Sequence, residues 1–223
     1  MRNRLALSVM LAALIPAVAT AQGKADGNAG KQPPPSGTIA AISPIFSQLV
    51  MLAYPREFKV AFEETNGDRY IREAVPAGET VERWTQLITV TGAKGLSANP
   101  NATPQAFVEQ IASGFKRACE PTFSATAVGE TKVSGQDAFM AIVGCGTVGA
   151  GDFRRSETAL IMAIKGTADF YTIQWAERGP ASDKATPANE ETWKERYKIL
   201  SPIRVCARVP GEAAPYPSCV NQK

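Results

Sequence analysis

Carboxylates are the residues of this sequence best suited to acid–base chemistry. They stand in two groups, Glu63 and Glu64 with Asp68, and Glu190 with Glu191. Two carboxyl groups held about 5–10 Å apart can act as acid and base, or as acid and nucleophile, in glycoside hydrolysis. Exposed glutamates are more often solvated, and the second group also suits the positive end of a helix. These acids leave open a small carboxylate-dependent hydrolase as an alternative to a protein without catalysis.

The 223-residue chain contains no histidine. Histidine is the commonest general base at neutral pH and a frequent metal ligand. Its absence rules out Ser-His-Asp and Cys-His nucleophile systems and the ordinary zinc-hydrolase sites. We therefore expect no catalytic residue, no metal site and no cofactor.

The glycine-rich stretch 144–149 fits the G-x-G-x-x-G pattern of dinucleotide-binding loops. That pattern binds a dinucleotide only where a helix follows it directly. Residues 152–156 lead instead into another strand pattern. We interpret the stretch as a hairpin loop.

Two further motifs also match a known pattern without the features that their function needs. Ser113 and Lys116 have the S-x-x-K spacing of penicillin-binding enzymes, but they fall late in a predicted helix and lack the partner motifs. Asn101-Ala102-Thr103 is a glycosylation sequon, which we expect to be unused. A polar helix surface explains the first motif, and a loop explains the second.

Five aromatic residues could line a ligand pocket: Trp84, Phe170, Tyr171, Trp175 and Trp193. An empty apolar cavity behind them would indicate a lipid or other hydrophobic-ligand carrier. Large aromatic side chains are more often core, so the carrier is a second alternative.

The first 21 residues have the three parts of a secretory signal peptide. Arg2 and Arg4 precede an apolar run from Leu5 to Val18, and Ala19-Thr20-Ala21 supplies the small residues before a cut. The run is shorter than the roughly 20 residues that span a bilayer, and no later run is long enough. We expect cleavage after Ala21 and a periplasmic or secreted protein without a transmembrane span.

Charge gives little reason to expect nucleic acid as a partner. Without Arg2 and Arg4 the chain has 22 basic residues against 21 acidic ones, a net charge of about +1. No basic run or stripe is present.

Four cysteines remain after cleavage, Cys119, Cys145, Cys206 and Cys219. An even number in an exported chain predicts two disulfides, for which three connectivities are possible. Cys119–Cys145 and Cys206–Cys219 are favoured because each pair is close in sequence.

The elements that must position these residues follow from hydrophobic periodicity. Residues 22–42 read as a flexible Gly/Pro/Ala-rich linker, 43–208 as a single domain, and 209–223 as an irregular, disulfide-pinned tail. Strands are expected over 48–53, 58–64, 68–75, 86–91, 122–130, 138–143, 158–164 and 170–174. A helical turn is expected over 80–84, and helices from Thr103-Pro104 to Arg117 and from about 187 to 200. This order predicts an α+β sandwich, an antiparallel sheet with two main helices packed on it.

Several segments resemble a family of small exported proteobacterial proteins without an assigned function. The resemblance rests on Pro55–Phe58, on 75–84 with 86–90, on Cys119 and Cys145, and on 163–166 with Phe170-Tyr171, within about residues 50–178. The element order is similar to Mog1/PsbP-like folds. The resemblance implies accessory or binding roles and brings no catalytic residues.

The sequence thus predicts a non-enzymatic, exported accessory or binding protein. Its partner would be an envelope protein or a small ligand, of unknown identity.

Overall fold

Seven antiparallel strands form the larger of two sheets, in the order β3-β4-β5-β9-β8-β7-β6. Their bounds are β3 Phe58–Asn66, β4 Arg69–Pro76, β5 Gln86–Ala93, β6 Phe123–Val133, β7 Gln136–Val148, β8 Arg155–Lys165 and β9 Phe170–Pro180. The computed structural model describes residues 37–221, which lie in one compact unit. The expected signal peptide and the linker up to residue 36 lie outside the described residues.

The central strands of the large sheet are buried on both faces. In β8, Leu160, Met162 and Ile164 contribute to one core cluster, while the alternate residues Ala159 and Ile161 contribute to the other. Successive side chains of a strand point to opposite faces, so a continuous apolar run needs cover on both sides.

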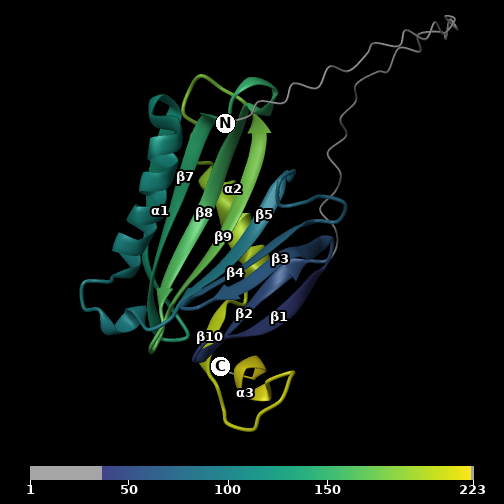
Figure 1. Ribbon diagram of the computed structural model, residues 1–223, viewed down its shortest axis with the longest axis vertical. Coiled ribbons are helices and arrows are strands. Elements are labelled where there is room, and N and C mark those ends of the chain that lie inside the picture. The colour runs from purple at the N-terminus through teal and green to yellow at the C-terminus, as the bar shows by residue number, and fades with distance from the viewer. Residues whose placement is uncertain (1–36, 222–223) are drawn as a thin grey trace, which may run out of the picture. The chain divides into compact units, whose positions relative to one another are not determined.

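Helix α1, Pro104–Cys119, covers one face of the large sheet over β7 and β8 (Figure 1). Thr103 Oγ1 caps the helix by accepting a hydrogen bond from the Ala106 N–H, and Pro104 occupies the first turn. Val108 is buried against the sheet, whereas Ala106 is exposed.

The opposite face is covered by helix α2 and by a second sheet. The small sheet has the order β1-β2-β10, with β1 Thr38–Ile45, β2 Gln48–Pro55 and β10 Arg204–Ala207. Helix α2, Glu190–Leu200, is capped by Asn189 and buries Trp193 and Leu200 in the same cluster as β2. In Figure 1, α2 lies behind β8 and β9, on the side away from α1.

Two disulfides join these elements in the expected pairing. Cys119–Cys145 ties the end of α1 to β7, and Cys206–Cys219 ties β10 to the short helix α3, Pro217–Val220. Three 3-10 turns complete the secondary structure, at Leu96–Ala98, Glu120–Thr122 and Gly151–Phe153. Among residues 37–221 no helix is long and apolar enough to cross a membrane.

The structure corrects the predicted fold in several places. It is dominated by strands, and two sheets replace the one expected, because β1 and β10 flank β2. Residues 38–42, which were predicted as part of the linker, lie instead in strand β1. Residues 80–84 form bends rather than a helical turn, since Thr80 Oγ1 accepts the Glu82 and Arg83 N–H groups.

Candidate functional site

The larger of two described cavities lies between the first turn of α1 and the β6–β7 hairpin. Its volume is about 540 Å³, within the usual range of ligand pockets. Three residues of α1's start, three of β6 and three of β7 line it: Thr103, Pro104, Gln105, Glu130, Thr131, Lys132, Asp137, Ala138 and Phe139.

The register of the hairpin determines which side chains reach the cavity floor. Glu130 is opposite Phe139, and Lys132 is opposite Asp137. Directly paired residues of antiparallel strands share a face, and Phe139 belongs to the cluster under α1. The side chains of Glu130, Lys132 and Asp137 therefore lie on the face that α1 partly covers.

The cavity carries charges of both signs. Lys132 Nζ donates to Asp137 Oδ1, and this hydrogen bond and the lysine charge lower the pKa of Asp137. Glu130 is exposed and makes no hydrogen bond or ion pair among the described residues. One acid is thus available to a ligand beside an existing ion pair.

The chain leading into α1 is also anchored. Lys165 Nζ donates to the Ala102 carbonyl at 3.1 Å and lies 5.9 Å from the centre of the Phe170 ring. Phe107 of α1 stacks on Phe170 with ring centroids 5.5 Å apart. These contacts hold the α1 wall of the cavity against β8 and β9.

This arrangement can bind a polar molecule, with Pro104 and Phe139 offering apolar contact. Sequence reasoning did not find the site. Thr103 and Pro104 were recognised only as a helix start, and the hairpin residues gave no motif.

The structure spreads the predicted acid pairs over separate elements. Glu63 and Glu64 lie on β3 and Asp68 in the β3–β4 turn, while Glu190 and Glu191 begin α2. Glu63 accepts from Tyr70 at 2.8 Å and Arg72 at 2.9 Å.

Those contacts explain the charge state of Glu63. The hydrogen bond from Arg72 has the largest effect and lowers the pKa of Glu63, against a smaller opposing effect of burial. Arg72 also donates to Ser43 of β1. Glu63 therefore helps to tie the two sheets together as an ionised acceptor.

Residues 144–148 of the glycine-rich stretch lie in β7 rather than in the predicted hairpin loop, and Gly149 lies in the connection to β8. Gly144 and Gly146 lie within this strand. Residues 181–187, which we call the strap, cross directly over it. A Cβ on Gly146 would lie 2.0 Å from the Lys184 carbonyl oxygen. The glycines permit this close approach and do not form a phosphate-binding loop.

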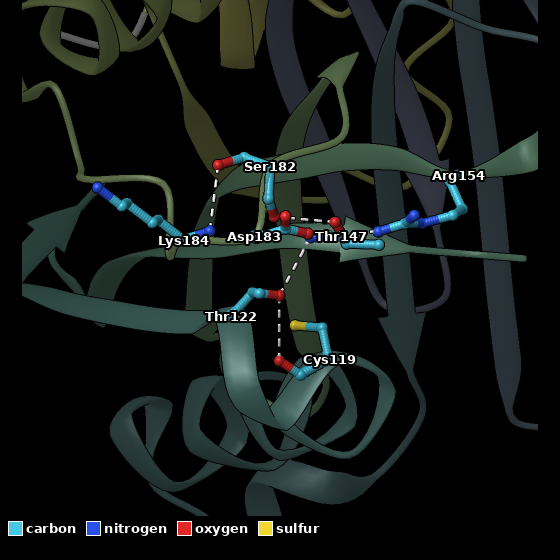
Figure 2. A network of polar contacts seen from close by, with 7 residues as sticks. All are labelled: Cys119, Thr122, Thr147, Arg154, Ser182, Asp183 and Lys184. Carbon is cyan, nitrogen blue, oxygen red and sulfur yellow. Dashed lines mark hydrogen bonds and ion pairs between the residues drawn. The ribbon is translucent and has the colours of Figure 1, made fainter.

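Figure 2 shows the polar contacts that hold the strap. Thr147 Oγ1 donates to the Ser182 carbonyl at 2.9 Å, and the Thr147 N–H donates to Thr122 Oγ1 at 3.1 Å. Arg154 reaches Asp183 at 3.4 Å. The strap is thereby joined to the end of α1 near Cys119.

The five aromatic residues lie in the core and do not line the described cavities. Tyr171, Trp175 and Trp193 are buried between the sheets and α2, Phe170 is buried against Phe107, and Trp84 lies on the α1 side. Nothing in their packing supports the hydrophobic carrier.

Trp84 has a specific partner on the α1 side. The guanidinium of Arg178 lies 3.4 Å from the ring centre of Trp84, and its Nε donates to Glu157 at 3.0 Å. Burial lowers the pKa of Arg178, although the hydrogen bond and charge of Glu157 oppose the shift. The cation–π contact covers the end of β9.

The other two motifs occupy structural positions. Ser113 Oγ donates to the Gln110 carbonyl inside α1 and accepts from Arg117, so no acylation geometry with Lys116 is formed. Thr103 of the sequon is the α1 cap.

No protein-family model matches the sequence, and no curated protein matches it. Among solved structures, the Ran-binding protein Mog1p of Saccharomyces cerevisiae is similar with a TM-score of 0.40 and 15% identity, over 74% of this chain and 86% of that one. PsbP of the cyanobacterium Synechocystis is similar with a TM-score of 0.41 and 12% identity, over 71% and 86%. A Bacteroides thetaiotaomicron protein gives 0.35 and 12%, over 73% and 46%. Each of these is a similarity of backbone fold.

Proposed function

We propose that this protein is a non-enzymatic binding protein of an exported compartment, and that its ligand is a small polar molecule held in the cavity at the start of α1. The observation that carries the proposal is the cavity itself. It combines an unengaged acid, an ion pair and an apolar wall on two rigid elements. Binding sites are commonly built in this way, with a few polar groups that fix orientation.

The compartment is supported by cysteine chemistry. All four cysteines are paired, and disulfides persist in oxidising compartments. We also propose a Mog1/PsbP-like arrangement of sheet and helices, because strands, a helix, further strands and a second helix follow in that order.

Ligand binding should depend on the charged side chains of Glu130, Lys132 and Asp137 at the floor of the cavity. In titrations of the ¹⁵N-labelled protein with a panel of amino acids, sugars and polyamines, at least one compound should shift the amide resonances of residues 103–105, 130–132 and 137–139. Glu130→Gln should weaken binding of a cationic or zwitterionic compound by about fivefold or more, the effect of losing roughly 1 kcal/mol of charge-assisted interaction.

The control is Glu195→Gln, an exposed acid on α2 away from the cavity lining. It should leave the affinity unchanged. Shifts confined to other residues would refute the site, and conversion of a bound compound into a product would refute the non-enzymatic assignment.

Export makes a separate prediction. Protein recovered from the periplasm of an expressing bacterium should start at Gln22, because the small residues Ala19 and Ala21 precede the expected cut in an A-x-A pattern. Intact mass measured without reductant should correspond to residues 22–223 minus four hydrogens for two disulfides. An uncleaved chain in the cytoplasmic fraction would contradict the assignment.

A further inference from the structure

The edges of the two sheets differ in how they are protected against pairing. An edge strand carries unpaired N–H and C=O groups, so natural proteins block it with charges, bulges, proline, shortness or a cover. In the part of the chain that the structure describes, the edges are β3 and β6 of the large sheet and β1 and β10 of the small one.

Both edges of the large sheet are blocked. The β3 register is interrupted by a bulge between Val60 and Phe62, and the β6 register by a bulge between Ala127 and Gly129. Each strand also carries charged residues, such as Lys59 on β3. A bulge and a charge both disfavour a flat new strand partner.

The edge at β10 is short and covered. The strand has only four residues, Arg204–Ala207. Its Cys206 is bonded to Cys219 of α3, and Arg204 Nη1 donates to the Cys219 carbonyl at 2.7 Å. This edge offers little room for another chain.

Among residues 37–221, strand β1 has none of these protections along most of its length. Its eight residues, Thr-Ile-Ala-Ala-Ile-Ser-Pro-Ile, include no charge, and its register with β2 runs from Thr38 to Ile45 without a shift. Pro44 stands only near the end. Residues 38–40 are exposed, and Ile39 is 51% exposed.

We propose that two copies of this chain pair antiparallel through β1, which joins their small sheets into one six-stranded sheet. A two-fold antiparallel pairing places each residue opposite itself or opposite a residue an even number of positions away. An edge with charges would bring like charges together, whereas β1 has none. In the register centred on Ala40, Ala40 faces Ala40, and Ile39 faces Ala41.

Other occupants fit β1 less well. The preceding residues Pro33-Pro34-Pro35 have no N–H groups to donate to a ladder. The exposed part of β1 presents no charged side chain that would select a foreign strand. A second copy needs no such recognition, because the same surface supplies both halves.

The association is expected to be weak. One strand edge is much smaller than the roughly 1,200–2,000 Å² that stable interfaces bury. Sedimentation equilibrium of the purified protein between about 10 μM and 1 mM should therefore show a monomer–dimer equilibrium that depends on concentration.

Three variants test the contact. Ala40→Lys places two like charges across the two-fold axis and should weaken dimerisation at least tenfold, while the exposed site leaves the monomer folded. Ala125→Lys, the same change at an exposed position of the β6 edge, should have no effect. A mixture of Ala40→Lys and Ala40→Glu should regain a heterodimer, which a misfolded variant would not.

Hydrogen exchange of the β1 amides separates the outcomes. Protection that rises with concentration supports the pairing. A monomer at every concentration overturns it, and protected β1 amides in that monomer would show that another part of the chain covers the edge. A dimer insensitive to Ala40→Lys would place the interface elsewhere.

Discussion

Replacing Asp169 by alanine should lower the free energy of unfolding by about 3–4 kcal/mol. Asp169 is 2% exposed and lies at the turn between β8 and β9. One carboxylate oxygen accepts from Ser47 N–H at 3.0 Å, Ser47 Oγ at 2.5 Å and the Tyr171 hydroxyl at 3.3 Å; the other accepts from Gly95 N–H at 2.7 Å. Alanine removes the charged acceptor of all four hydrogen bonds, and a hydrogen bond to a charged group contributes about 1.5–3 kcal/mol. Ser47 and Gly95 are exposed and can turn to water, and the Tyr171 hydroxyl keeps the Ile45 carbonyl at 3.2 Å, so the total cost stays well below the sum of the four.

Chemical denaturation measures this effect. The carboxylate joins the β1–β2 turn, the end of β5 and the β8–β9 turn, so its loss loosens three connections at once. The control is Asp183→Ala, whose side chain is 96% exposed and whose ion pair with Arg154 is on the surface. It should change stability by less than about 1 kcal/mol. An Asp169→Ala cost that small would contradict the hydrogen-bond network.

The Asp169 effect should also depend on pH. Burial raises the pKa of this carboxyl, but hydrogen bonds from Ser47, Gly95 and Tyr171 together outweigh burial and lower it. A carboxyl whose pKa is lower in the folded state adds stability above its unfolded pKa of about 3.9 and loses it as pH falls through the folded value. The difference between the parent and Asp169→Ala should therefore be full at pH 7 and shrink below about pH 4.

Replacing Gly146 by alanine should cost about 2–4 kcal/mol, because a methyl group has no room under the strap. Its Cβ would lie 2.0 Å from the Lys184 carbonyl oxygen and 2.7 Å from that of Ser182. Both are backbone atoms, so no side-chain rotation relieves the clash. The strap must move, which breaks the 2.8 Å hydrogen bond from Ser182 N–H to the Gly146 carbonyl.

Thermal and chemical unfolding measure this cost, and hydrogen exchange at residues 181–187 locates it. The matched control is Gly114→Ala in the middle of α1, where the nearest atom to a new Cβ is Arg117 Nη2 at 3.9 Å. Alanine should stabilise the helix there by about 0.5–1 kcal/mol. If both variants behaved alike, the strap would not rest on Gly146.

Local patterns in the sequence predicted most elements of the fold. Thr103-Pro104 marked the start of α1, and Pro202 followed the end of α2 at Leu200. The strands expected over 58–64 and 68–75 form the β3–β4 hairpin, in which Asn66 pairs with Arg69 and the loop residues are Gly67, at a φ of 58°, and Asp68. These signals depend on residues within a few positions, so a single sequence contains them.

Local patterns failed where distant segments meet. The strand β10 has only four residues, and it forms because β2 offers an open edge and Cys206 is bonded to Cys219. The glycines 144 and 146 are expected in a hairpin loop, because they stand between two strand patterns with no helix after them, but they lie within β7. Their function became visible only with the strap, about 40 residues later, packed against them.

The candidate site shows the same division between sequence and structure. Each lining residue is ordinary by itself, and nothing in the sequence connects Gln105 with Glu130 or Asp137. The register of β6 against β7 and the packing of α1 on that hairpin bring them together. The proposed binding site is therefore a product of the tertiary structure.

The sequence by itself restricted the chemistry open to this protein and predicted its compartment. The absence of histidine restricts its chemistry, and four cysteines together with the expected signal peptide predict an oxidising compartment. Tertiary structure decided that the two groups of acids lie on separate elements, that the glycines make room for a strap, and that polar residues from three elements share one cavity. Composition and short motifs act locally, whereas contacts between residues far apart in the chain depend on packing and strand register.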